Sequence, residues 1–156
     1  YYSGHADARG LRLGADVMSW EELKASIRSV DADVRLGVLD ACRAGAITRI
    51  KGATLAAPLE IEAPPDAEGE AWLAASSDDE EAQESDTLRS SFFTHYLVSG
   101  LRGAADTGSD GYVSLQEAYT YARDRTVART SGTDVGAQHP RYSTRSPATT
   151  TSSSPT

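Results

Sequence analysis

A cysteine and a histidine are the residues of this sequence best suited to catalysis. Cys42 is the only cysteine in the chain and closes an apolar run that begins at Val34. His5 closes a shorter run, Tyr1-Tyr2-Ser3-Gly4, of the same kind. A cysteine attacks acyl carbons as its thiolate, and a neighbouring imidazole can take the thiol proton. Two adjacent strands ending in these residues would bring a nucleophile and its base together.

The segment between the two runs supports that placement. Ser19 and Glu22 form a capping box, because the hydroxyl and the carboxylate can each satisfy a free backbone amide. Apolar residues follow at three- and four-residue spacing and predict one buried helix face: Trp20, Leu23, Ile27 and Val30. A strand over 1–6, this helix and a buried strand over 34–40 make a βαβ unit. Ligands bind such units at the carboxyl ends of the strands, where His5 and Cys42 would lie.

The middle of the chain is predicted to be loop and strand. Residues 7–18 are expected to be a loop or hairpin, and 43–69 a long flexible loop between the two halves of the domain. Residues 70–76 are expected to be a third strand, followed by a solvated acidic loop over 78–84.

The last third of the chain is predicted to be mostly helical. A helix over 92–101 would present Phe93, Leu97 and Leu101 on one face, with Gly103 just past its end. Ser114 and Glu117 form a second capping box, for a helix reaching about residue 128. A short strand is expected over 141–143. The domain is expected to span residues 1–145, and the Ser/Thr/Pro-rich tail 146–156 to be disordered.

Composition limits the partners of this chain. Its 156 residues, 39% of them hydrophobic, suit one globular domain of α/β class. The net charge of -8 argues against nucleic acid or an anionic membrane as partner and suits a cationic substrate. No apolar run approaches the roughly 20 residues that span a bilayer. A single cysteine implies no oxidising compartment, so localisation stays unknown, with the cytoplasm slightly favoured.

The two motifs together resemble the caspase-like cysteine peptidases, and most closely the bacterial caspase-family and metacaspase members. They are Tyr2-Ser3-Gly4-His5 and, about 35 residues later, Leu39-Asp40-Ala41-Cys42-Arg43-Ala44-Gly45. Later stretches fit as well: Ala74-Ala75-Ser76-Ser77, Ala82-Gln83-Glu84, Ser91-Phe92-Phe93-Thr94 and Gly100 to Asp106. The resemblance covers roughly residues 1–130. It implies a mostly parallel sheet flanked by helices, a three-layer sandwich, in a cysteine endopeptidase.

The resemblance also implies roles for particular residues. His5 would be the general base and Cys42 the nucleophile, and the backbone amides of Ala6 and Cys42 would bind the oxyanion. Ser3 and Asp40 would line an acidic primary pocket, with Ser76 as a further substrate-binding residue. A carboxylate in that pocket selects Arg or Lys, so cleavage is expected after basic residues of a protein or peptide.

Two departures from the family pattern stand out. Residue 6 is Ala where the family has Gly, so the oxyanion amide requires backbone angles that tolerate a Cβ. The family sheet also has two strands before the histidine strand, with a further acidic pocket residue. Those strands are missing here, so we expect the chain to be a fragment whose sheet has an exposed apolar edge.

Several alternatives stay open. A caspase-like fold can serve as a non-catalytic regulatory or interaction domain, and His139 competes with His5 as base. His95 is expected on a helix surface. Residues 106–117 scan as an EF-hand loop, although a tight Asp-Gly turn before the second capping box explains them better; no cofactor is expected, with calcium left open. Arg49 and Lys51 would suit self-cleavage by a basic-specific peptidase, against the simpler interpretation of two exposed cations.

Overall fold

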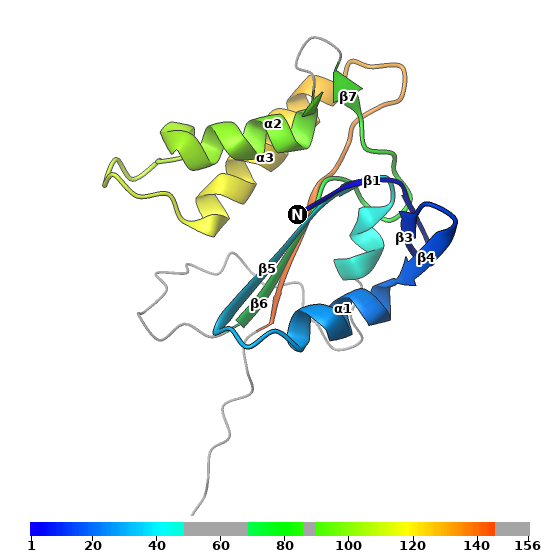
Figure 1. The fold of residues 1–156 in the computed structure, drawn as a ribbon. Coiled ribbons are helices and arrows are strands. Elements are labelled where there is room, and N and C mark those ends of the chain that lie inside the picture. Colours follow the sequence, from blue (N-terminus) through cyan, green and yellow to red (C-terminus); the bar gives the residue numbers. More distant parts are fainter. Residues whose placement is uncertain (49–68, 86–89, 146–156) are drawn as a thin grey trace, which may run out of the picture.

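The computed structural model describes residues 1–48, 69–85 and 90–145 and shows an α/β fold (Figure 1). Its central sheet has the strand order β1 (Tyr2–Gly4), β5 (Val34–Ala41), β6 (Gly69–Ala74) and β9 (Arg141–Arg145). The first three strands are parallel, and β9 pairs antiparallel with β6. The sheet is therefore mixed, and the prediction of an α/β domain is confirmed. Arg49, Lys51 and the tail 146–156 lie outside the described residues.

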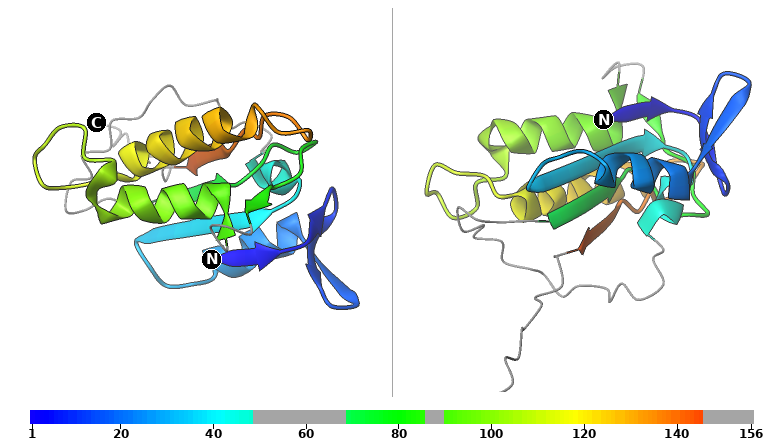
Figure 2. Two further views of the ribbon diagram at one scale, coloured as in Figure 1. Left: turned by 90° about the horizontal axis from the view of Figure 1, so that it is seen from above. Right: turned by 60° about the horizontal axis from the view of Figure 1, so that its bottom comes forward.

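Helices cover both faces of this sheet (Figures 1 and 2). The helix α1 (Trp20–Arg28) and the short 3-10 helix η1 (Ala44–Thr48) lie on one face, and α2 (Phe92–Ser99) and α3 (Leu115–Thr130) on the other. In the described parts of the chain, no helix has the length and apolar character needed to cross a membrane.

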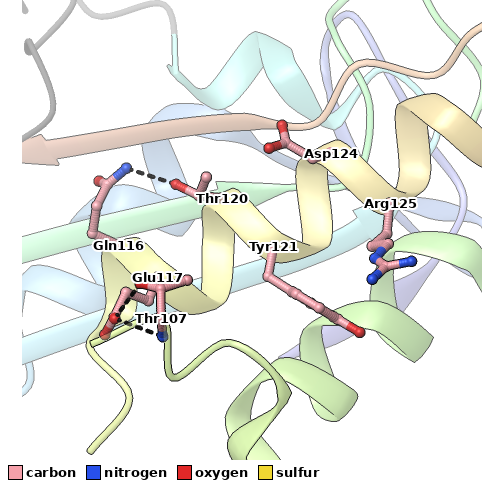
Figure 3. A pocket seen from close by; sticks show the side chains of 7 residues that line it. All are labelled: Thr107, Gln116, Glu117, Thr120, Tyr121, Asp124 and Arg125. Carbon is pink, nitrogen blue, oxygen red and sulfur yellow. Dashed lines mark hydrogen bonds between the residues drawn. The ribbon is translucent and has the colours of Figure 1, made fainter. Parts of the chain in front are cut away.

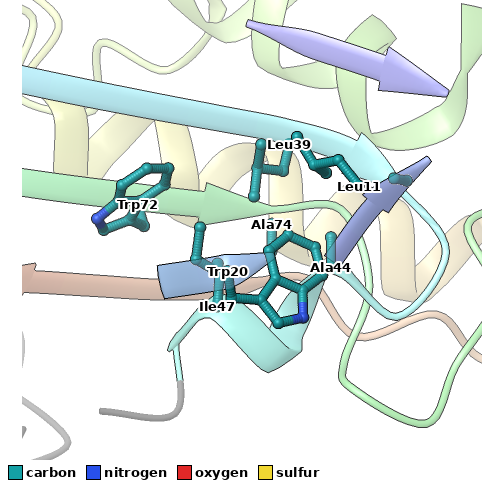
Figure 4. Close-up of a cluster of buried hydrophobic side chains, with 8 residues drawn as sticks. Leu11, Trp20, Leu39, Ala44, Ile47, Trp72 and Ala74 are labelled. Carbon is teal, nitrogen blue, oxygen red and sulfur yellow. The ribbon is translucent and has the colours of Figure 1, made fainter. Parts of the chain in front are cut away.

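Each face of the sheet has its own hydrophobic cluster, and β6 contributes to both. Trp72 and Ala74 belong to the cluster under α1 and η1 (Figure 4), whereas Leu73 lies in the cluster under α2 and α3. This alternation follows from the two-residue period of a strand. The side chains of all three residues are at most 2% exposed, so β6 is the buried centre of the fold.

Both predicted capping boxes form. The Ser19 amide donates to Glu22 Oε2 over 2.8 Å and the Glu22 amide to Ser19 Oγ over 3.2 Å, and α1 starts at Trp20. Ser114 and Glu117 make the same pair of bonds at the start of α3, over 2.9 and 3.2 Å. Val30, expected on the buried face of α1, lies past its end and is 51% exposed.

The second helix ends earlier than the spacing of its apolar residues predicts. Phe93 and Leu97 are buried, as expected, but α2 stops at Ser99. A wider π-type turn, η2 (Gly100–Ala104), follows, and it leaves Leu101 54% exposed. Gly103 has a φ of 111°, a backbone conformation that only glycine adopts easily.

The N-terminal strand is shorter than predicted, because the chain enters a second sheet after His5. This sheet is antiparallel and contains β2 (Ala6–Asp7), β3 (Gly10–Leu13) and β4 (Asp16–Ser19), so the hairpin expected over 7–18 is present. A further small pair, β7 (Glu84–Ser85) with β8 (Ser90–Ser91), precedes α2.

The strand β5 is covered on both faces only in its second half. Leu39 and Ala41 are buried, but Val34 and Leu36 are 59% and 45% exposed. The prediction of continuous burial is therefore wrong for the start of β5. Within the described residues β1 pairs only with residues 39–41, and the start of β5 forms an open edge.

A buried carboxylate ties α1 to the sheet. Glu70 accepts hydrogen bonds from Arg28 Nε at 2.7 Å, Arg28 Nη2 at 3.0 Å and Trp72 Nε1 at 2.7 Å. Burial raises the pKa of Glu70, but the hydrogen bonds from Arg28 and Trp72 outweigh it and hold the pKa below its usual value. The βαβ unit is thus fastened at the end of the sheet away from Cys42.

We expect Glu70→Gln to lower the free energy of unfolding at pH 7 by about 1–3 kcal/mol, because it weakens a charge-assisted pair with Arg28. Since the pKa of Glu70 is lower in the folded chain, this stabilisation is present above the ordinary value of 4.5 and fades as the pH falls below it. Urea unfolding at pH 7 and pH 3.5 measures both effects. Glu84→Gln, at an exposed position, serves as the control.

Candidate active site

The register between β1 and β5 brings the two predicted catalytic residues together. Tyr2 lies beside Leu39, Ser3 beside Asp40 and Gly4 beside Ala41 in a parallel pair. His5 and Cys42 directly follow the last residues of the two strands. The side chain of Cys42 is half-buried and that of His5 is exposed. Both therefore occupy the carboxyl edge of the sheet, at adjacent strand ends.

The backbone of His5 is fixed by two donors. The Arg12 amide and the Tyr2 hydroxyl each donate to the His5 carbonyl oxygen over 2.9 Å. Tyr2 can reach back because residue 4 is glycine: a Cβ there would lie 2.7 Å from the tyrosine oxygen. Gly4 of the Ser-Gly-His motif is thus needed for the anchor that holds the histidine backbone.

The turn that carries Cys42 is held from the end of β6. Arg43 adopts a left-handed conformation with a φ of 57°, and its amide donates to the Glu80 carbonyl oxygen over 2.9 Å. Ser76 is fully buried and donates its hydroxyl to the Ala41 carbonyl oxygen over 3.1 Å. The predicted substrate-binding residue Ser76 therefore has its side chain beneath the nucleophile, where it supports the turn.

The hairpin geometry leaves the Ala6 amide free to act as an oxyanion donor. Ala6 pairs with Leu11, and the Arg12 amide donates to His5, one residue before Ala6. Hydrogen-bonded and non-hydrogen-bonded pairs alternate in an antiparallel ladder, so Ala6 and Leu11 form a non-hydrogen-bonded pair. The Ala6 N–H consequently points away from β3. Ala6 is not among the non-glycine residues with a positive φ, so its Cβ is tolerated.

The predicted pocket carboxylate, Asp40, is buried and held by hydroxyl groups. Its Oδ2 accepts hydrogen bonds from Ser91 Oγ at 2.5 Å, Thr94 Oγ1 at 2.6 Å and Tyr1 Oη at 3.3 Å. Only 6% of the residue is exposed, and no cation of the described chain pairs with it. Ser3, its register partner, is exposed. Asp40 thus lies on β5, two residues before Cys42, as a carboxylate with which no cation of the described residues pairs.

Three residues that donate to Asp40 were not singled out from the sequence as site residues: Tyr1, Ser91 and Thr94. Ser91 is the N-cap of α2, and its Oγ accepts from the Thr94 amide over 3.0 Å while it donates to Asp40. The serine three residues before a threonine at a helix start is the signal that could have revealed the cap. Its contact with Asp40 joins positions 51 residues apart, which no local pattern reports.

His139, the rival base, contacts a carboxylate outside the strand-end pair. Its Nδ1 lies 2.6 Å from Glu80 Oε1, and its amide donates to Glu80 Oε2 over 2.7 Å. Burial raises the pKa of Glu80, but the bonds from His139 and Ser77 prevail and lower it. The acidic segment 78–84 was predicted to be only a solvated loop; through Glu80 it instead supports the Cys42 turn. His95 lies on α2 with its ring edge against Tyr96.

The acidic side chains of the EF-hand-like segment accept hydrogen bonds from residues of the same segment. Glu117 accepts from Ser114 and Thr107, and these bonds lower its pKa to about 2. Asp106 accepts from the amides of Asp110 and Gly111. Across the described residues, no three potential metal ligands of the His, Cys, Asp and Glu types gather in one place. The structure contains a turn followed by the capping box, as the sequence favoured.

Two surface cavities lie elsewhere. One of about 400 Å³ runs along α3 (Figure 3). Its walls include Glu117, Tyr121 and Arg125. The other, of about 370 Å³, lies where β5 and β6 begin, at the edge opposite Cys42, and is lined mainly by charged residues. Neither of these two cavities is lined by His5 or Cys42.

No family model, curated protein or solved structure matches this chain.

Replacing Gly45 should displace the Cys42 turn. A Cβ at residue 45 would lie 2.7 Å from backbone atoms of Ser77 and Asp78, which cannot move without shifting the end of β6. We expect Gly45→Ala to lower the free energy of unfolding by about 1–3 kcal/mol. Gly132→Ala, where the Cβ meets nothing within 4 Å, should stay within about 0.5 kcal/mol of the unchanged chain. Equal unfolding midpoints for the two variants would contradict this description of the turn.

Proposed function

We propose that this chain carries the catalytic centre of a caspase-like cysteine endopeptidase that cleaves after Lys or Arg. The observation that carries the proposal is the parallel register of β1 with β5, which pairs Ser3 with Asp40 and ends directly before His5 and Cys42. A thiol, an imidazole and a carboxylate with no cation partner among the described residues thus occur at one pair of neighbouring strand ends. The caspase-like resemblance of the two sequence motifs predicts the same four residues.

In the proposed reaction, Cys42 Sγ attacks the carbonyl carbon of the scissile peptide bond and His5 takes the thiol proton. The oxyanion formed on the carbonyl accepts hydrogen bonds from the Ala6 and Cys42 amides. Collapse of this intermediate breaks the C–N bond, and His5 gives the proton to the leaving amine. Water, deprotonated by His5, then hydrolyses the thioester and restores the thiol.

Asp40 is proposed to select the residue before the cut. Its side chain points to the α2 face of β5, where it bonds to Ser91 and Thr94, and Cys42 follows two residues later in the turn after this strand. A buried carboxylate without a cation strongly favours a positively charged partner, because burial weakens the screening of charge by water. The substrate is therefore a protein or peptide with Lys or Arg at that position.

Removing either member of the catalytic pair should abolish peptidase activity. We expect Cys42→Ala and His5→Ala each to lower kcat/KM for peptidyl-Lys and peptidyl-Arg aminocoumarin amides by about 10³-fold or more. His95→Ala is the matched control and should keep the rate within a few-fold. Activity retained by the Cys42 variant would overturn the assignment of Cys42 as the nucleophile. Loss of activity in His139→Ala but not in His5→Ala would make His139 the base. A chain without Cys42-dependent cleavage would support the non-catalytic alternative.

The pocket charge can be tested separately from the chemistry. Asp40→Asn keeps the size of the side chain and an acceptor oxygen for Ser91 and Thr94, but it removes the charge. We expect a fall of at least about 100-fold in kcat/KM for basic substrates, mostly through KM. The rate of Cys42 alkylation by iodoacetamide, which needs no pocket, should change less than threefold. A parallel fall in both rates would indicate a structural role for Asp40.

A further inference from the structure

The two oxygens of Asp40 have different surroundings. All the hydrogen bonds that Asp40 accepts within the described chain converge on Oδ2, from Ser91, Thr94 and Tyr1. Oδ1 accepts none of them, and it is not among the fully enclosed side-chain atoms of the described residues that lack a partner. The site therefore offers an incoming cation one carboxylate oxygen and not two.

The difference between the two oxygens of Asp40 affects arginine and lysine side chains differently. A guanidinium pairs best through two parallel N–H bonds, one to each carboxylate oxygen. An oxygen has two lone pairs, and Oδ2 already receives three hydroxyl donors. The second N–H group of a guanidinium therefore cannot bond to Oδ2. An ammonium needs only one carboxylate oxygen, and its other N–H groups can bond to hydroxyl oxygens or water.

The hydroxyl oxygens around Asp40 suit those remaining ammonium donors. Thr94 is half-buried beside the carboxylate, and its Oγ1 lies 3.2 Å from Tyr1 Oη. On the other side, Ser3 is exposed on β1 as the register partner of Asp40. Hydroxyl-bearing residues thus lie next to Asp40 on α2 and at the register position on the neighbouring strand.

We propose that Ser91 and Thr94 are specificity-determining residues that occupy Asp40 Oδ2 and thereby make the site select lysine over arginine. This inference rests on the proposed function and narrows its substrate to peptides with Lys before the cut. Thr94 supplies the stronger test, because Ser91 also caps α2 and its removal would weaken the helix. Valine at position 94 keeps the shape of threonine but donates no hydrogen bond, so Oδ2 keeps only the bond from Ser91 and the longer one, at 3.3 Å, from the exposed Tyr1. The second N–H group of a guanidinium can then displace Tyr1 and bond to Oδ2.

The test compares alkylation of Cys42 in the full chain by peptidyl-Lys and peptidyl-Arg chloromethyl ketones of otherwise identical sequence. In this reaction the Cys42 sulfur forms a bond to the methylene carbon and chloride leaves. We expect the unchanged chain to react faster with the Lys reagent. In Thr94→Val, the ratio of the Lys to the Arg rate should fall about tenfold, because the guanidinium gains a charge-assisted hydrogen bond.

Thr120→Val, the same substitution on α3, is the control and should leave the ratio unchanged. A faster reaction with the Arg reagent in the unchanged chain, or the same ratio in Thr94→Val and Thr120→Val, would overturn the lysine preference while leaving the peptidase proposal intact. If neither reagent labels Cys42 faster than an uncharged peptidyl analogue, the basic-specific function fails, and this inference fails with it.

Discussion

The parallel pairing of β1 with β5 is the constraint on which the candidate site depends. Three residue pairs define it, and two of them bear on the proposed site. Ser3 pairs with the proposed pocket residue Asp40, and Gly4 pairs with Ala41 directly before His5 and Cys42. Because successive strand residues face opposite ways, a slip of one residue would turn every β1 side chain to the other face. The Tyr2 hydroxyl, by bonding the His5 and Arg12 carbonyl oxygens, locks the strand end to the hairpin that follows.

Asp40 connects the sheet to the helical layer as well as to the proposed substrate. The serine that caps α2 is also a donor to this carboxylate, so the start of the helix and the proposed specificity site are held by one group. A buried carboxylate needs such donors because burial removes its hydration. The hydroxyls supply hydrogen bonds without supplying charge, which leaves the negative charge of the site available to a cation.

The turn that contains Cys42 is supported by segments distant in sequence. Glu80 accepts from the Arg43 amide through its backbone and contacts His139 through its side chain. Gln138, 1% exposed, donates to the Ala75 carbonyl oxygen and accepts from the Gln83 amide. Buried polar groups of this kind are stable only when their partners are all in place. The turn after β5, the loop after β6 and the segment before β9 therefore form one hydrogen-bonded unit around Cys42.

The sequence by itself determined the local elements, and its two motifs led to His5 and Cys42 as the pair that we propose to be catalytic. Capping boxes, helical spacing and buried runs are encoded within a few residues, so α1, α3, β5 and β6 were predictable to within about two residues at most of their ends. The tertiary structure alone decided that β1 stops at Gly4, that Val34 and Leu36 are exposed, that Ser76 supports the turn, and that Asp40 is bound by Ser91 and Thr94. These features depend on contacts between residues far apart in the chain, and a pattern of neighbouring residues carries no record of such contacts.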